Sequence, residues 1–565
     1  TGLDVVECYD IGGARALWRD LAPGKPALAI IPLFDAQTAD ANETTRTLWS
    51  LALEGGPRGA VLWDDAPGSD GGGARALLDG EGKPTAIADA LRPALNALNG
   101  EAGALLAHSE RIHDGIAVLY SPASVRMHWL LEANRLHGDT WLQAWGADTS
   151  AERRQSPQLR LRESWGKLLD DLGLGWRFIS SAQIENKDIL NPELRIKTLV
   201  LPQSIALSDR EAEVLKTFVQ GGGKIVADAV CGRFDEHGRK RDKPALDGLL
   251  KLDTSAEPLA PQAMNPLETI VAFNIQHATQ TDADTYTKEF LSHLPPVYSD
   301  RPKRIGLNSV TFGLEYRRSP VLASSKAGVF LNLDLTDYLR WRLHPDDPRA
   351  KTARDVLAHA VFSERLNECL IDWSKSKVPL GTQAVWLQRR GGGATARVLA
   401  LRRNLQNRLH ELGDEADGNW GFEKNDPFTL VLRAPATVIA LNGTGGAAPT
   451  KNIDGQLNSI TPRVFVVNTR PSHPPKVSAA QRCRLGDTIS IEVKSAETSS
   501  ALFSLRLIAP DGTGRPYHAL TRYCGDGSLS IQIPIAFSEP EGAWKLVVRD
   551  LGQGTETTTV ITMAR

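Results

Sequence analysis

Acidic side chains and one tryptophan stand directly after short apolar stretches at the start of this sequence. GAVLWDD ends in Trp63, Asp64 and Asp65, IIPLFDAQ contains one aspartate, and VVECYD contains a glutamate and an aspartate. Carboxyl groups in such places can serve as general acids, general bases or nucleophiles. A metal site is not indicated at the paired aspartates, because no histidine or third acid joins them at a suitable spacing.

Strands and helices alternate around these residues over 1–108. ALAIIPLF has no polar residue before its aspartate, which is typical of a strand that is buried on both faces. Apolar stripes through Leu48 and Leu95 predict helices after the second and third strands. The polar groups therefore stand at the carboxyl ends of strands, where α/β barrels place their sites, and we interpret 1–108 as the C-terminal part of an (α/β)8 barrel.

A second α/β unit is predicted over 109–375. GIAVLYSP, WRFIS, KTLVLPQ and KIVADA read as strands with helices between them. Ser208 and Glu211 have the spacing of a capping box, and a glycine triplet ends the helix that they begin. This repetition predicts a doubly wound parallel sheet. A closing helix is expected near 350–373, while 255–320 has an irregular pattern without a clear assignment.

The apolar period changes to two after about residue 375. Alternating stretches predict a small antiparallel β domain over 376–448, and a Pro/Ser/Asn-rich connection over 449–476 reads as a linker. Further alternating stretches, with turn signals between them, predict an Ig-like β-sandwich over 477–565. The predicted fold class is therefore multidomain α/β plus all-β.

Composition limits the classes of partner. The 565-residue chain has 41% hydrophobic and 23% charged residues and a formal net charge of −2, without a basic stripe. Nucleic acids and anionic membranes are therefore not expected as partners. The apolar runs are strand-sized, so no membrane span is predicted, and no cofactor is predicted either. The chain begins at Thr1 rather than Met, so we expect a removed leader, a longer N-terminal part or a fragment.

The five cysteines show no CxxC or Cys/His metal spacing. Cys483 and Cys524 lie in the same β-rich segment, and a disulfide between them is one alternative. The other three, at positions 8, 231 and 369, are most simply small core residues.

One long stretch carries a family resemblance: LVLPQSIALSDREAEVLKTFVQGGGKIVADAVCGRFDEHG. A strand ends at Pro202, LSD introduces a helix, and a glycine triplet leads to a further strand and an FDEHG turn. Together with the order of the units, this resembles the glycoside hydrolase family 42 β-galactosidases over roughly residues 1–445. In that family a catalytic (α/β)8 barrel (a TIM barrel) precedes a trimerisation domain with the flavodoxin-like fold of class I glutamine amidotransferases, and a small β domain follows.

The resemblance implies that GAVLWDD, ALAIIPLF and VVECYD are barrel strands eight, seven and six. About five strands with their helices, roughly 200 residues, would then lie elsewhere. A three-strand remnant cannot close, because its edge strands would present unpaired backbone groups. We therefore expect a second chain that carries the N-terminal barrel half, or further sequence before Thr1. In the alternative, the three strands add to another sheet of this chain.

The resemblance also assigns roles to the first acidic residues. Retaining glycosidases use two carboxyl groups about 5 Å apart, and in this family the nucleophile is a glutamate from strand seven. Asp35 stands near that position as an aspartate, which departs from the family pattern, and a loop cap is its alternative role. Glu7 and Asp10 are expected to contact substrate hydroxyls, and a glutamate hydrogen-bonded inside the barrel is the alternative.

Two residues after strand eight complete the candidate site. Trp63 is expected to stack on a sugar face, with core packing as its alternative. Asp64 is expected either to bind substrate or to act as a solvated turn residue, as Asp65 does.

Glutamine hydrolysis would need an activated cysteine in the second unit. SIALSD contains none, while Cys231 has Asp235 and His237 near it in sequence. The corresponding domain is catalytically silent in the related hydrolases, so we expect a structural role. The resemblance also implies a homo-oligomer, most simply a trimer.

Two functions follow. The first is the C-terminal part of a β-galactosidase-like glycoside hydrolase that acts on oligosaccharides or polysaccharides. The alternative is a non-catalytic structural or carbohydrate-binding envelope protein, which the absent strand-seven glutamate and the added sandwich favour. Both predict a carbohydrate partner and a secreted, periplasmic or cell-envelope location.

Overall fold

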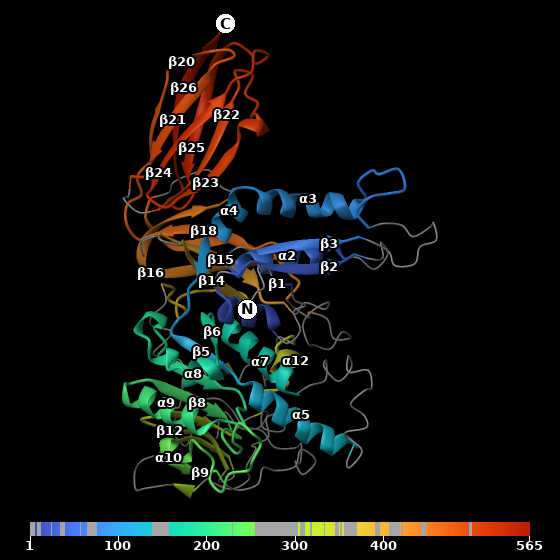
Figure 1. The fold of residues 1–565 in the computed structure, drawn as a ribbon, viewed down its shortest axis with the longest axis vertical. Coiled ribbons are helices and arrows are strands. Elements are labelled where there is room, and N and C mark those ends of the chain that lie inside the picture. Colours follow the sequence, from blue (N-terminus) through green and yellow to red (C-terminus); the bar gives the residue numbers. More distant parts are fainter. Residues whose placement is uncertain are drawn as a thin grey trace.

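A computed structural model arranges the described residues in six sheets (Figure 1). The described residues are 6–7, 13–23, 25–33, 40–56, 58–64, 76–137, 157–228, 230–254, 303–304, 311–316, 319–332, 334–344, 350, 353–354, 370–389, 396–405, 419, 422–441, 448–496 and 500–565. The helix expected near 350–373 lies largely outside them.

The chain begins with a three-stranded parallel sheet. Its strands are β1 (Val6–Glu7), β2 (Ala27–Pro32) and β3 (Arg58–Trp63), with β2 in the centre. Its helices are α1 (Ala14–Leu21), α2 (Ala41–Leu53), α3 (Ala86–Asn99) and α4 (Glu101–Ala107). Ile31 and Leu33 are buried in a core with Leu48 of α2 and Leu95 of α3. Because side chains alternate along a strand, this core covers one face of the sheet only.

The second unit contains a seven-stranded sheet. Its strands are β5 (Ile116–Tyr120), β6 (Trp176–Ser180), β7 (Thr198–Leu201), β8 (Lys224–Asp228), β11 (Thr311–Tyr316), β12 (Ser319–Ser325) and β13 (Gly328–Leu331), and their order is β11-β12-β13-β8-β7-β5-β6. The five strands from β13 to β6 are parallel, as the strand-helix repetition predicts. β12 pairs antiparallel with β13 and with β11.

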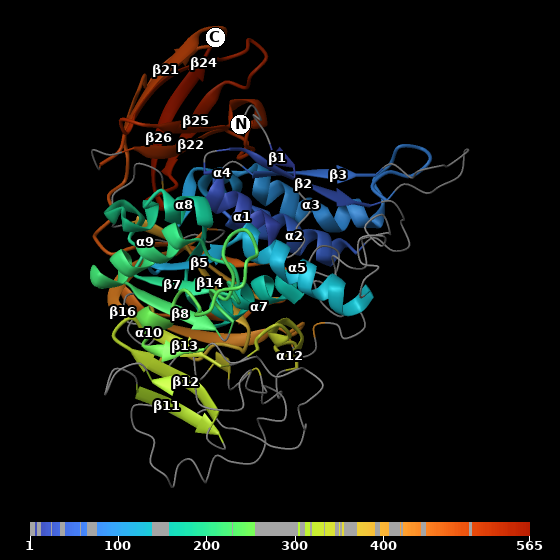
Figure 2. The same cartoon turned by 60° about the horizontal axis from the view of Figure 1, so that its bottom comes forward.

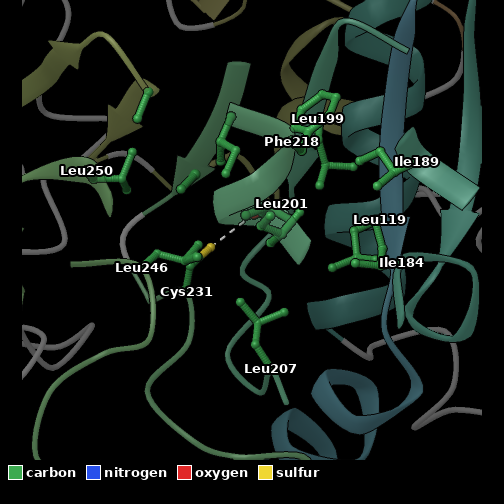
Figure 3. Packing of buried hydrophobic residues seen from close by; sticks show 14 of the residues in the cluster. Leu119, Ile184, Ile189, Leu199, Leu201, Leu207, Phe218, Cys231, Leu246 and Leu250 are labelled. Carbon is green, nitrogen blue, oxygen red and sulfur yellow. Dashed lines mark hydrogen bonds between the residues drawn. The ribbon is translucent and has the colours of Figure 1, made fainter. Parts of the chain in front are cut away.

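Helices cover both faces of the parallel strands. They include α5 (Pro122–His137), α7 (Pro157–Asp171), α8 (Ser181–Glu185), α9 (Asp209–Gln220), α10 (Asp247–Leu250) and α12 (Tyr338–Trp341). The predicted capping box is present, because Ser208 and Glu211 exchange side-chain-to-backbone hydrogen bonds at the start of α9. Figure 3 shows the core beneath α8 and α9, where Leu201 and Phe218 pack with Cys231.

A six-stranded antiparallel sheet follows. Its strands are β4 (Ser109–Arg111), β14 (Thr382–Arg389), β15 (Ala396–Arg403), β16 (Asp426–Ala440), β17 (Thr450–Leu457) and β18 (Arg463–Asn468), in the order β17-β16-β18-β15-β14-β4. The linker predicted over 449–476 is therefore wrong for most of its length. Many of its polar residues lie in turns or on exposed strand positions, although Asn468 of β18 is buried, while Ile453, Leu457 and Val467 enter the core of the sheet.

Two sheets enclose the C-terminal core. One contains β19 (Lys476–Ala479), β21 (Thr488–Lys494) and β24 (Ser528–Pro534), and the other contains β20 (Arg482–Arg484), β22 (Ala501–Ile508), β23 (Leu520–Cys524), β25 (Gly542–Asp550) and β26 (Thr555–Ala564). Ile491 from the first sheet and Phe503 and Trp544 from the second share one buried cluster.

The alternative of a disulfide between Cys483 and Cys524 is wrong for this structure, since both are free. Cys483 lies on β20 and Cys524 on β23, the two edges of a five-stranded sheet. Four strand spacings of about 4.8 Å separate these edges by about 19 Å. A disulfide needs Cα atoms within about 7 Å of each other.

The parts contact one another through polar and apolar side chains. In Figure 1 the C-terminal sheets stand at one end of the long axis and the α/β unit at the other, and in Figure 2 β11 and β12 again lie far from the C-terminus. Glu101 of α4 accepts hydrogen bonds from the Ser504 hydroxyl at 2.7 Å and from Arg549 at 3.1 Å. The Arg342 guanidinium binds both oxygens of Asp171 at 2.7 Å, and both side chains are almost completely buried.

Candidate functional site

Trp63 lies at the carboxyl end of β3, on the face of the sheet opposite α2 and α3. Its carbonyl accepts a hydrogen bond of 2.8 Å from the N–H of Leu33, which fixes the backbone beside the end of β2. The side chain is 43% exposed, and Val61, two residues earlier on the same face, is 45% exposed. Trp63 is therefore not a core residue of the described structure. Stacking on a sugar face stays a prediction.

Asp64 follows Trp63 and points to the helix-covered side. Its two carboxylate oxygens accept hydrogen bonds from the backbone N–H groups of Ala76 at 2.6 Å and Leu77 at 3.0 Å. The Thr85 hydroxyl in turn donates to the Ala76 carbonyl. Asp64 therefore holds the chain at residues 76–77, and its predicted contact with substrate stays a prediction.

The remaining predicted site residues are not placed by the structure. Glu7 pairs in register with Leu28 of β2 through its backbone, and its side chain lies outside the described residues. Asp10, Asp35 and Asp65 also lie outside them. Their predicted roles stay predictions.

Cys231 is buried beneath β7 and is not activated as a nucleophile. Its Sγ donates to the carbonyl of Leu201 at 3.2 Å, the contact drawn in Figure 3, and lies 3.5 Å from Oδ1 of Asp228. Burial and the nearby Asp228 carboxyl raise the pKa of the thiol well above its ordinary value, whereas a nucleophilic cysteine needs a lowered pKa. Asp235 accepts instead from the backbone N–H of His237, within its own exposed turn.

Protein groups bind one another at the carboxyl edge of the parallel strands in the α/β unit. Doubly wound sheets usually bind ligands there, in the crevice between neighbouring strands whose connections diverge. Between β5 and β7, the hydroxyls of Ser121 and Ser124 donate to the Ala206 carbonyl at 3.3 and 3.0 Å. The Gln203 N–H donates to both oxygens of Asp228, at 2.7 and 2.8 Å. These contacts agree with the structural role expected for this unit.

Sequence reasoning missed a charged cluster at the opposite, amino-terminal end of β3. Arg19 of α1 binds Asp20 at 2.7 Å and Glu54 at 2.6 Å, and Arg111 of β4 binds Asp170 at 3.2 Å. Burial alone would raise the pKa of Glu54, but Arg19 and Arg111 lower it to about 2. In α/β barrels, residues at the amino-terminal ends of the strands contribute to stability rather than to catalysis. We therefore interpret these ion pairs as a contact that holds the two α/β parts together, and we call it the joint.

Neither a metal-binding cluster nor a membrane-spanning helix is present among the described residues. No group of three or more His, Cys, Asp or Glu side chains in this part of the chain is placed to bind a metal ion. None of the described helices combines the length and the apolar character needed to cross a membrane.

Comparison with solved structures identifies the fold. No protein-family model matches the sequence, and no curated protein matches it. Gan42B, a GH42 β-galactosidase from G. stearothermophilus, matches with a TM-score of 0.50 at 13% identity. The β-galactosidase from Bacillus circulans sp. alkalophilus matches with a TM-score of 0.51 at 12% identity. The chain has the fold of part of a GH42 β-galactosidase.

The match covers a larger share of this chain than of the solved structures. Both alignments cover 81% of this chain, but only 56% of Gan42B and 57% of the B. circulans enzyme. The chain therefore spans little more than half the length of the GH42 structures that it matches. The resemblance predicted from the sequence is confirmed for the fold, and at this identity for the fold alone.

Proposed function

We propose that this chain is the C-terminal part of a GH42 β-galactosidase-like glycoside hydrolase that acts on oligosaccharides or polysaccharides. The observation that carries the proposal is the open apolar face of a parallel sheet, at Val61 and Trp63. Parallel sheets occur almost only with both faces covered. An (α/β)8 barrel covers this face with its own interior and pairs both edges of the sheet.

In this proposal β1, β2 and β3 are barrel strands six, seven and eight. The remaining strands, and with them the general acid, come from further sequence or from a second chain. Asp35 follows β2 and acts as the nucleophile, while Glu7 and Asp10 follow or end β1 and contact substrate hydroxyls. Trp63 stacks on a sugar ring. Asp64 contributes to substrate binding by holding the rim at residues 76–77.

The other parts receive supporting roles. The α/β unit is a flavodoxin-like, class I glutamine amidotransferase-like domain that joins copies of the chain, most simply as a trimer. The C-terminal pair of sheets is an Ig-like sandwich of a secreted, periplasmic or cell-envelope protein. The hydrogen bonds at the carboxyl edge and the inactive thiol of Cys231 support a non-catalytic α/β unit.

Activity of the complete barrel tests the proposal. The protein is purified from its natural source, its intact mass and N-terminus are measured, and hydrolysis of an aryl β-galactoside is assayed. Replacing a nucleophile removes a group that acts in the transition state, so Asp35→Asn lowers kcat/KM by at least about 10³-fold. Asp526→Asn, in an exposed turn next to Ser528, is the matched control and leaves activity unchanged. Full activity of Asp35→Asn contradicts the assignment.

A carbohydrate-binding envelope protein is the second candidate. It is favoured by the residue after β2, which is an aspartate where the family has a glutamate, and by the carboxylate of Asp64, whose two oxygens bind backbone groups. This candidate predicts that the complete protein binds galactosides without hydrolysing them. Trp63→Ala then weakens binding, while Asp35→Asn has no effect.

A further inference from the structure

A cavity of about 220 Å³ lies where the amino-terminal edge of the α/β sheet meets the six-stranded sheet. The loops that enter β5 and β6 line it at Gly115 and Gly175. A Cβ at Gly115 would stand 2.9 Å from the Arg195 carbonyl oxygen, and one at Gly175 would stand 2.6 Å from that of Ile112. The backbone therefore approaches closely around the cavity, at the edge opposite the one where α/β sheets usually bind ligands.

The charged side chains around the cavity carry an excess of positive charge. Arg195 and Lys197, which precede β7, and Arg397 of β15 line it together with one carboxylate, Asp114. Oδ2 of Asp114 accepts a hydrogen bond of 2.6 Å from the N–H of Gly175, which holds it against the loop. Three cations therefore face one carboxylate, which leaves two positive charges in excess.

Arg397 is the least exposed of these three cations. It is half-buried, and its Nε is buried without a hydrogen-bond partner. Within the described part of the chain, neither Arg397 nor Arg195 forms an ion pair. Burial lowers the pKa of the Arg397 guanidinium, Asp114 partly offsets this, and Arg195 lowers it further. A buried donor of this kind is costly unless a ligand or water accepts its hydrogen bond.

His113 also lines the cavity, and its pKa is lowered mainly by burial and by arginines outside the cavity, with Asp20 acting in the opposite direction. Burial, and after it the charge of Arg177, lower the pKa of His113 to about 4, and Arg195 contributes in the same direction. Its Nδ1 accepts a hydrogen bond of 3.3 Å from the Gly115 N–H, so the neutral ring carries its proton on Nε2. Another lining residue, Arg111, adds little net charge because it is paired with Asp170.

We propose that this cavity binds a small divalent oxyanion of the sulfate or phosphate type, free or as the ester group of a sugar. A dianion balances the two excess charges, and arginine donors match the oxygens of such groups in geometry. Trp386 and Leu370 give the cavity an apolar wall for an attached ring. Its volume is below the roughly 300–1,000 Å³ of drug-sized ligand pockets, which limits the ligand to a small one.

Calorimetric titration tests the proposal on the 565-residue chain in a low-salt chloride buffer. Sodium sulfate, sodium phosphate, glucose 6-sulfate and glucose 6-phosphate are the probes. We expect saturable one-site binding with a Kd below about 1 mM for at least one of them. Free ions that bind as tightly as the esters identify the free oxyanion as the ligand, and esters that bind at least about tenfold more tightly identify the sugar ester.

Variants locate the binding. Arg397→Gln weakens it by at least about tenfold, because it removes a charge-assisted hydrogen-bond donor. Arg195 is exposed, so the fold tolerates Arg195→Gln, and this variant weakens binding by several-fold. Arg482→Gln, an exposed arginine of β20, is the matched control and leaves binding unchanged. Circular dichroism confirms that each variant is folded.

A titration of the His113 ring by NMR supplies a second readout. A bound dianion stabilises the imidazolium, so saturating sulfate raises the pKa of His113 from about 4, while exposed His237 does not respond. The proposal is overturned if no probe saturates, if both arginine variants bind as tightly as the unchanged chain, or if sulfate binds without a change at His113.

Discussion

Two parallel sheets in this chain are covered to different extents. In the α/β unit, β5 lies between two apolar cores. Ile116 and Val118 face the core that contains Trp165, and Ala117 and Leu119 face the core on the other side. All of these side chains are nearly inaccessible to solvent.

The three-stranded sheet has only one such core. Ile31 and Leu33 enter it, while Val61 and Trp63 on the other face are exposed by more than two-fifths. Since β5 and β2 are both apolar strands with parallel neighbours on each side, the difference lies in what covers their sheets. The α/β unit therefore completes its own core, whereas among the described residues the first sheet has a core on one face only. Covering of its other face by further polypeptide is part of the function proposed above.

Two tryptophans give the sharpest contrast. Trp165→Ala in α7 removes a side chain with no exposed surface and destabilises the α/β unit by about 3–5 kcal/mol. Trp63→Ala removes an exposed ring and changes stability by less than about 0.5 kcal/mol. Amide hydrogen exchange of β5 and β3 measures each effect locally. A large loss of protection in β3 on Trp63→Ala would show that this ring is part of a formed core.

Two ion pairs extend the contrast to charges. Asp171→Asn leaves the buried guanidinium of Arg342 without its counter-charge and costs about 3–5 kcal/mol. Asp89→Asn breaks an exposed pair with Arg92 in α3 and costs less than about 0.5 kcal/mol. Urea unfolding, followed by exchange in α7 and α3, compares the two. Equal costs would contradict the contrast between the buried pair of the α/β unit and the exposed pair beside the first sheet.

The joint between the two parts predicts a dependence on pH. Because the pKa of Glu54 falls from 4.5 to about 2 in the folded chain, its ionised form stabilises the joint above about pH 5. This contribution, of about 3 kcal/mol, is lost as the pH falls from 4.5 towards 2. Glu54→Gln lowers stability at neutral pH and removes the loss of stability between pH 4.5 and 2. The exposed control Glu213→Gln changes neither the stability at neutral pH nor its loss in acid. Thermal unfolding at a series of pH values tests this dependence. Identical plots of Tm against pH for Glu54→Gln and the unchanged chain would refute it.

Two valines give the smallest and best matched contrast. Val118→Ala in β5 deletes two buried methyl groups and costs about 2 kcal/mol, since about 0.8 kcal/mol is lost for each group together with a cavity term. Val61→Ala in β3 costs less than about 0.5 kcal/mol. The free energies of exchange for the two strands give both values. Comparable losses would remove the distinction between the sheets.

Local patterns predicted the elements well and the long-range contacts poorly. The apolar run of ALAIIPLF and the capping box at Ser208 depend on residues close in sequence, and the predicted strand and capping box are both present. The burial of both strand faces expected from ALAIIPLF is not found, because Leu28 and Ile30 are only half-buried. The linker over 449–476 failed because TKNIDGQL, the sequence of β17, buries only two side chains and resembles a turn-rich connection. A mostly polar strand at the edge of a sheet carries little signal of its own.

The site and the joint were less accessible to sequence reasoning. Asp64 was recognised as either a ligand or a turn residue, and only its bonds to the backbone at 76–77 favour the second role. Arg19 meets Glu54 across 35 residues, and Arg342 meets Asp171 across 171. Such pairs form because the fold brings together elements that are distant in sequence, so no spacing in the sequence predicts them.

The central claim is that the open face of β3 is covered in the complete protein. The most direct test labels Val61→Cys with a maleimide and reads the modification at position 61 by peptide mass spectrometry, with Val118→Cys as the buried control. We predict rapid labelling at 61 in the 565-residue chain and labelling slower by at least about tenfold when the complete protein is produced in its natural source with the same substitution, with slow labelling at 118 in both. Equal rates at position 61 in the two preparations would contradict the account.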